Sequence, residues 1–88
     1  MKNTPILHDL VNRIDSRESL IVFIRLLADD FRDNSEEWEN KKLDRYLDAL
    51  SAWVEDMDGY FRNRGKTVPE NPTWELLGKI FLASKYYE

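Results

Sequence analysis

The sequence contains few residues whose type and spacing would suit catalysis. His8 is the single histidine among the 88 residues, and there is no cysteine. A histidine activates a nucleophile only when a suitable hydroxyl or carboxyl side chain lies within hydrogen-bond reach, and spacing along the chain does not reveal one. His8 stands beside the apolar side of a short predicted helix, so we interpret it as a surface or half-buried structural residue.

The run Asp-Met-Asp-Gly at residues 56–59 suggests a calcium site but lacks the spacing of one. Counted from Asp56, the position that requires glycine in a calcium-binding loop holds Phe61. On a continuous helix, Asp56 and Asp58 point about 200° apart and cannot share an ion. A metal-dependent hydrolase would therefore need a helix break at Gly59. It is the weakest functional alternative, and we expect no metal and no cofactor.

The other acids and the glycines also argue against an enzyme. Paired carboxylates for acid–base catalysis need a cleft and opposed pKa values, whereas the acids of this chain are distributed as on solvated helix faces. The three glycines do not have the spacing of a phosphate-binding loop. We predict that the protein has no catalytic residues and is not an enzyme.

The charge balance favours a protein partner over nucleic acid. The formal net charge is −4, and lysines and arginines are scattered among acids, whereas nucleic-acid-binding domains are usually basic or carry a basic stripe. The densest basic run, residues 62–66, stands at a predicted helix end, where cations interact favourably with the helix dipole. We predict no nucleic-acid binding and an acidic surface that favours a basic protein.

Length and composition predict one cytoplasmic domain spanning residues 1–88. A chain of this size can build a single core. No segment approaches the roughly 18 consecutive apolar residues of a membrane span, and the first residues lack the apolar region of a signal peptide. The absence of cysteine fits a reducing compartment.

Residues 40–65 carry the strongest periodic pattern in the chain. Apolar side chains recur there at steps of three and four, which predicts a helix of about six turns whose apolar stripe the other helices cover. The stripe consists of Leu43, Tyr46, Leu47, Leu50, Trp53, Val54, Met57, Tyr60 and Phe61. Asn40 is the predicted N-cap and Gly65 the predicted left-handed C-cap. Gly59 predicts either a break in the helix or a close approach of another segment.

Three shorter helices are predicted, from residue 5 to 14, from residue 16 to about 31 and from residue 72 onwards. Asp15, with Glu18 three residues later, is the predicted N-cap of the second, and Asn71 is that of the last.

The run Leu-Ile-Val-Phe-Ile at residues 20–24 could form a buried strand, but its apolar pattern continues too long for one. We predict a helix here, and expect it to be the most buried of the domain. The sequence thus predicts an all-α fold, a compact bundle of about four helices in a single domain.

Trp38 interrupts an acidic and polar stretch between two predicted helices. A tryptophan in such a loop either folds back onto the core, which we favour, or stays exposed and serves as an anchor for a partner. Tryptophan and tyrosine with flanking charge are common anchors of protein interfaces. The two tyrosines at residues 86 and 87 are expected to be held against the body of the domain.

Several segments together resemble a family of short bacterial all-helical domains of unknown function. They are Trp38-Glu39-Asn40, residues 46–50, the run Trp-x-x-Asp-Met-Asp-Gly-Tyr at residues 53–60, Pro72-Thr73-Trp74 and residues 86–88. The similarity covers most of the chain after Asp15. It implies an all-helical fold and no defined catalytic residues. Some members lie beside toxin genes, so the resemblance also favours an immunity protein.

We therefore predict a small acidic protein that binds a basic toxin, such as a nuclease, and neutralises it by occlusion. The predicted partner-binding residues are Asp44, Asp48, Glu55, Asp56 and Asp58, which steer the encounter, and Trp38, which anchors it. The alternative is a structural or regulatory adaptor, or a self-associating protein, without an inhibitory role. A large exposed apolar patch would favour that alternative. The expected oligomeric state is a monomer or homodimer.

Overall fold

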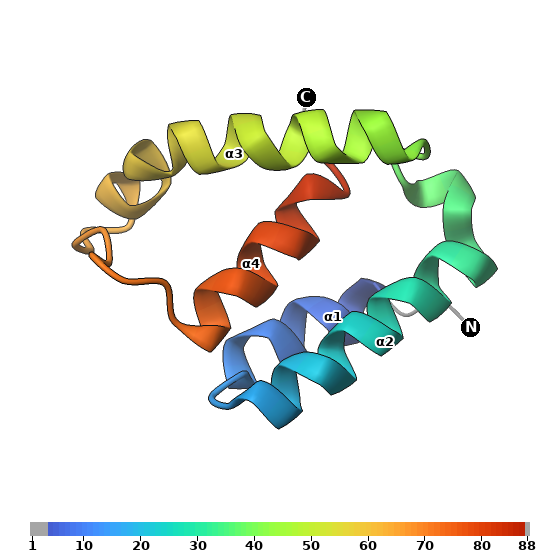
Figure 1. Ribbon diagram of the computed structural model, residues 1–88, viewed down its shortest axis with the longest axis horizontal. Helices are drawn as coiled ribbons and strands as arrows, with labels where there is room; N and C mark the ends of the chain where they lie inside the picture. The colour runs from blue at the N-terminus through green and yellow to red at the C-terminus, as the bar shows by residue number, and fades with distance from the viewer. Residues whose placement is uncertain (1–3, 88) are drawn as a thin grey trace.

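The computed structural model describes residues 4–87, and every regular element in that range is helical (Figure 1). The elements are α1 (Thr4–Leu10), the 3₁₀ turn η1 (Val11–Arg13), α2 (Arg17–Asn34), the 3₁₀ turn η2 (Ser35–Glu37), α3 (Leu43–Asn63) and α4 (Trp74–Ser84). The predicted all-α class with four helices is confirmed. The run at residues 20–24 lies inside α2, so the helical interpretation of this segment is also confirmed.

The short helix α4 is the element that the others surround. It packs against α3 on one side and against α2 and η1 on the other (Figure 1). We expected the long helix at residues 40–65 to hold this central place, and that expectation is wrong. α3 lies along one edge of the fold, and its principal helix contact is with α4.

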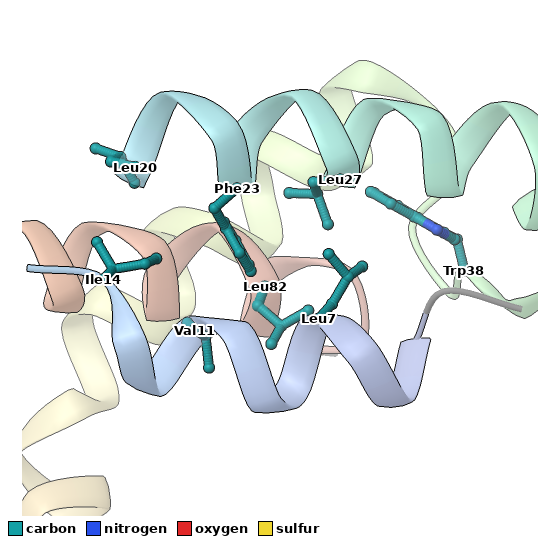
Figure 2. Close-up of a cluster of buried hydrophobic side chains, with 8 residues drawn as sticks. All are labelled: Leu7, Val11, Ile14, Leu20, Phe23, Leu27, Trp38 and Leu82. Carbon is teal, nitrogen blue, oxygen red and sulfur yellow. The ribbon is translucent and has the colours of Figure 1, made fainter. Parts of the chain in front are cut away.

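The main core lies where α1, η1, α2 and α4 meet (Figure 2). Its buried residues are Leu7, Val11, Ile14, Leu20, Phe23, Leu27, Trp38 and Leu82. Phe23 points from α2 towards Leu82 of α4, with Leu7 of α1 beside them. A second, smaller cluster of Trp53, Phe61 and Leu76 joins α3 to α4.

The helix α2 is less enclosed than its composition suggests. Ile21, Val22, Ile24 and Phe31 are all exposed, although we expected this helix to be the most buried. α2 packs with α1 and α4 on one side only, so apolar residues on its other side remain in solvent. The apolar character of a residue therefore does not by itself show that the residue lies in the core.

Two of the predicted helix N-caps are shifted to a nearby residue. The N-cap of α2 is Ser16 rather than Asp15, because the hydroxyl of Ser16 and that of Ser19 each accept the other residue's backbone N–H at 3.1 Å. α4 is capped by Thr73 rather than Asn71, through a hydrogen bond of 3.0 Å from the backbone N–H of Leu76. Both caps satisfy backbone donors that a helix start leaves open.

Asn40 does not cap α3, which begins three residues later without a side-chain cap. Its amide instead donates to the carbonyl oxygens of Ser84 at 2.9 Å and Tyr87 at 2.7 Å. The backbone N–H groups of Glu39 and Asn40 both donate to the carbonyl of Lys85. Residues 39–40 thus satisfy carbonyl groups at the end of α4 that a helix leaves unpaired.

Of the two glycines with a predicted role in the long helix, one has that role and the other does not. Gly65 has a φ of 66°, and the backbone N–H of Lys66 donates to the carbonyl of Phe61 at 2.9 Å, so the predicted left-handed C-cap is confirmed. Gly59 marks neither a break nor a close approach, because α3 continues past it and an added Cβ would meet nothing within 4 Å. A close approach occurs instead at Gly78, where a Cβ would lie 2.3 Å from Cδ1 of Ile14.

Candidate functional site

Four of the predicted partner-binding acids form a continuous stripe on the exposed side of α3. Asp44, Asp48, Glu55 and Asp58 lie within about 80° of one another around the helix axis, given 100° per residue. All four are exposed, and none forms an ion pair with another described residue. Arg62 follows at the C-terminal end of the same side. We call these four residues the acidic stripe.

Asp56, the fifth predicted acid, is not part of the acidic stripe. It lies about 100° around the helix from Glu55, and its carboxylate accepts a hydrogen bond from the hydroxyl of Tyr87. That hydrogen bond raises the pKa of Tyr87, because the carboxylate favours the protonated phenol. Asp56 thus holds the C-terminal residues on α3, which confirms that the terminal tyrosines are fixed to the body of the domain.

An exposed apolar ridge runs beside the acidic stripe. Leu43, Leu47 and Val54 lie within about 40° of one another on α3, and their exposed fractions are 74%, 51% and 38%. We predicted that these residues face the core, and that prediction is wrong. α4 covers only the part of the α3 surface around Ala49, Trp53 and Phe61, so the remaining apolar residues stay in solvent.

The ridge continues into an apolar groove between α2 and the start of α3. The groove has a volume of about 400 Å³, and its lining includes Ile24 and Phe31 from α2 and Leu43 and Tyr46 from α3. Lys41 and Lys42 also line it, at the N-terminal end of α3. Acids, an apolar ridge and an apolar groove thus adjoin one another on one part of the surface.

Trp38 contributes to this groove from below and is not an exposed anchor. It is only 6% exposed, with Phe31 edge-on at 5.1 Å between ring centroids and Tyr46 at 5.8 Å. Of the two placements considered for Trp38, folding back onto the core is confirmed, and an exposed anchor is wrong. The physical reason is a buried polar network that holds its indole ring in place.

Asp30 is the centre of that buried network, and sequence reasoning missed it. Its carboxylate accepts hydrogen bonds from the indole N–H of Trp38 at 2.8 Å, the ammonium of Lys85 at 2.8 Å and the amide of Asn34 at 3.2 Å. Asp30 and Lys85 are both fully buried. Lys85 also lies 5.4 Å from the Trp38 ring centroid and 4.9 Å from that of Tyr86, within the range of cation–π attraction.

The network favours the charged form of the Asp30 carboxyl. Burial alone would raise the pKa of Asp30, but hydrogen bonds from Lys85, Trp38 and Asn34 and the charge of Lys85 outweigh burial and hold this pKa below its ordinary value. A buried charge requires such pairing. The network joins α2, the segment around Trp38 and the end of α4, and so fixes the floor of the groove.

The sequence does contain a signal for this network. Leu20, Phe23 and Leu27 follow a three–four spacing on α2, and the same spacing continues to Asp30 and Asn34. A charged residue in register with an apolar face predicts a buried, paired group. Its partner Lys85 stands 55 residues away, and no local pattern indicates it.

Within residues 4–87, two kinds of site are missing. No helix there combines the length and apolar character that a membrane span requires, and no three metal-ligating side chains gather closely enough to hold an ion. α3 also runs unbroken past Gly59. The break that would bring Asp56 and Asp58 together is therefore absent.

A family model described as "Family of unknown function (DUF7660)" matches residues 16–88. The chain belongs to this family. The DUF7660 match begins at Ser16, the N-cap of α2, which confirms a domain family of unknown function over the chain after Asp15. α1 and η1 precede the match, although Leu7 and Val11 from these two elements are buried in the main core. Neither the curated proteins nor the solved structures contain a match to the chain.

Proposed function

We propose that this DUF7660 domain is a protein-binding module, and that the acidic stripe with the adjoining apolar ridge receives a basic, amphipathic segment of a partner. The observation that carries the proposal is that acids without an ion pair to another described residue lie beside exposed leucines along α3. Asp44 and Asp48 stand directly beside Leu43 and Leu47, and all four are exposed.

The two parts of this surface would do different work. Carboxylates that form no ion pair with another described residue steer a basic partner and raise its association rate. Exposed leucine and valine side chains contribute affinity when a partner removes them from water, at about 25 cal/mol per Å² of apolar area buried. A partner that fits both parts carries lysine or arginine along one side of an apolar surface.

The more specific proposal is that the domain inhibits the partner it binds. A domain that covers the basic surface of a nuclease toxin blocks access of the negatively charged substrate without any chemistry of its own, and so neutralises the toxin by occlusion. The acids of α3 resemble a phosphate backbone in charge, which supports a target that normally binds nucleic acid. The resemblance carried by residues 53–60 implies relatives encoded beside toxin genes, and it favours the same kind of target.

The test is to co-express the chain with the product of the neighbouring open reading frame and to measure their association by stopped flow at low salt. The double variant Asp48→Lys/Glu55→Lys should slow association by about tenfold to a hundredfold, since electrostatic steering contributes factors of this size. Leu43→Ala/Leu47→Ala should instead mainly raise the dissociation rate. Rescue of growth by the wild-type chain then tests inhibition of the toxin separately.

The matched control is Asp33→Lys/Glu70→Lys, which changes the net charge equally but alters exposed residues outside α3. An equal loss of association rate in both double variants would mean that overall charge, rather than the acidic stripe, attracts the partner. Unchanged rates in the α3 variant would remove this face from consideration.

Self-association is the second candidate function, and the number of exposed apolar residues on α2 and α3 favours it. Ile24 and Phe31 adjoin Leu43 around the groove, and all three are exposed. A patch of this kind is typical of an interface. Light scattering across a range of protein concentrations decides this point: a dimer that Leu43→Ala dissociates would put self-association ahead.

A further inference from the structure

A second concavity lies on another part of the surface, between α1–η1, α3 and α4, and its chemistry differs from that of the acidic stripe. It has a volume of about 560 Å³, which is within the range of small-molecule sites. We propose that this concavity binds a nucleoside monophosphate, in which a planar aromatic base is joined through a ribose to a phosphate. The polar and charged side chains that line it are His8, Asn12, Arg64 and Lys79, and we call it the basic pocket.

The charge of the basic pocket is opposite to that of the whole chain. Acids outnumber lysines and arginines by 17 to 13 in the sequence, yet no carboxylate is among the lining residues. Lys79 pairs with Glu75 at 2.9 Å, and the guanidinium of Arg64 has no ion pair with a described residue. Arginine binds phosphate through several N–H groups at once. Within residues 4–87, the Arg64 guanidinium donates one hydrogen bond, to the carbonyl of Tyr60 at 3.4 Å.

Aromatic rings form much of the rest of the wall. Trp53 meets Tyr60 edge-on at 5.2 Å between centroids, and Tyr86 stacks on His8 at 5.9 Å with 21° between the ring planes. The guanidinium of Arg64 lies 3.8 Å from the centroid of Tyr60. Rings arranged around a cation offer a stacking surface to a base beside a contact for its phosphate.

The pocket also collects hydrogen-bond donors that the protein does not use. Trp53 is 8% exposed, and its indole N–H has no acceptor among the described residues. The indole nitrogen itself is open to solvent, because it is not among the enclosed polar atoms that lack a partner, so its N–H can donate to a ligand in the pocket. The hydroxyl groups of Tyr60 and Tyr86 likewise form no hydrogen bond with the described chain. A nucleotide supplies acceptors on its phosphate, ribose and base.

A phosphate fits the charge of this site better than a carboxylate does. The Arg64 guanidinium, which has no ion pair with a described residue, and the Lys79 ammonium, which is paired with Glu75, both line the pocket. A monophosphate carries nearly two negative charges at neutral pH, whereas a carboxylate carries one. The aromatic wall explains why an inorganic anion alone would use only part of the site.

The experiment titrates the full chain with AMP, adenosine and inorganic phosphate and follows backbone, indole and guanidinium N–H resonances by nuclear magnetic resonance. AMP should give saturable shifts centred on the indole N–H of Trp53 and on Arg64. Adenosine and phosphate should each bind about tenfold more weakly or worse, because each lacks one of the two contacts. AMP shifts that do not saturate, or that lie outside the pocket, would overturn the proposal.

Arg64→Gln tests the site directly, because Arg64 is exposed at the end of α3 and its loss does not open the core. This variant should weaken AMP binding by about tenfold or more, as expected for a charged hydrogen-bonding group. Arg25→Gln removes an equal charge from exposed α2 and should leave AMP binding unchanged. Equal weakening in both variants would mean that AMP responds to net charge alone, and would reject the pocket.

Discussion

The buried pair of Asp30 and Lys85 should be the most sensitive point of this fold. Lys85→Met leaves a fully buried carboxylate without its counter-charge, although Trp38 and Asn34 still donate to it. Removal of one partner from a buried ion pair lowers the free energy of unfolding by about 3–5 kcal/mol. A small domain has only about 5–15 kcal/mol in total, so this substitution should remove a large share of it.

A double variant measures the interaction between Asp30 and Lys85 apart from their contacts with other residues. Asp30→Asn keeps an acceptor for the indole of Trp38 but removes the charge, and Lys85→Met then removes the ammonium that would otherwise be left alone. We expect Asp30→Asn/Lys85→Met to be less destabilised than the sum of the single variants, by about 2–3 kcal/mol, because contacting residues in one network are coupled to this extent. Urea unfolding followed by circular dichroism gives all four stabilities.

The same network predicts how the free energy of unfolding changes at acid pH. Because the pKa of Asp30 is lowered in the folded protein, its contribution to stability is complete above the unfolded pKa of about 3.9 and is lost as pH falls below that value. Asp30→Asn should therefore flatten the loss of stability in this acid range.

The description of a coupled buried pair would be refuted by either of two results. The stability losses of the two single variants could add up to that of the double variant, or each single variant could lie within about 1 kcal/mol of wild type.

Three further predictions concern local features of the helices. Gly59→Ala should raise the free energy of unfolding by about 0.5–1 kcal/mol, because α3 is continuous there and alanine is the better helix former; an unchanged thermal midpoint would contradict this. Gly78→Ala should instead lower it by about 1 kcal/mol or more, since the new Cβ would lie 2.3 Å from Cδ1 of buried Ile14 and overpacking costs more than the gain in helix propensity; a stabilised variant would show that Ile14 moves aside freely. Burial raises the pKa of Tyr46 from 10.0 to about 12, so stability should be complete below pH 10 and fall by up to about 2 kcal/mol as pH rises towards 12; Tyr46→Phe should lack this loss in urea titrations.

Much of the fold followed from short-range patterns in the sequence. The helical interpretation of residues 20–24 was correct because a long three–four periodicity and a capping signal at its start are both local properties of a helix. The C-cap at Gly65 was correct because glycine tolerates the left-handed conformation that ends a helix there. Both features depend on residues within a few positions of one another.

The candidate sites depended on packing that no local pattern describes. The sequence predicted five partner-binding acids on one helix. The structure groups four of them in the acidic stripe and places Asp56 outside it, against Tyr87. The sequence did not predict the exposed ridge beside the stripe. α3 carries more apolar surface than α4 can cover. Which leucines were left in solvent was decided by the neighbouring helix.

The sequence by itself determined that the chain is helical, where α3 ends and that this helix carries several acids, because these follow from residues a few positions apart. Only the tertiary structure decided that α4 is central, that Trp38 lies under the groove and that Asp30 is paired. The ammonium that satisfies Asp30 comes from Lys85, 55 residues later. Burial of a charge is possible only when such a distant partner is brought to it, and that is a property of the folded chain.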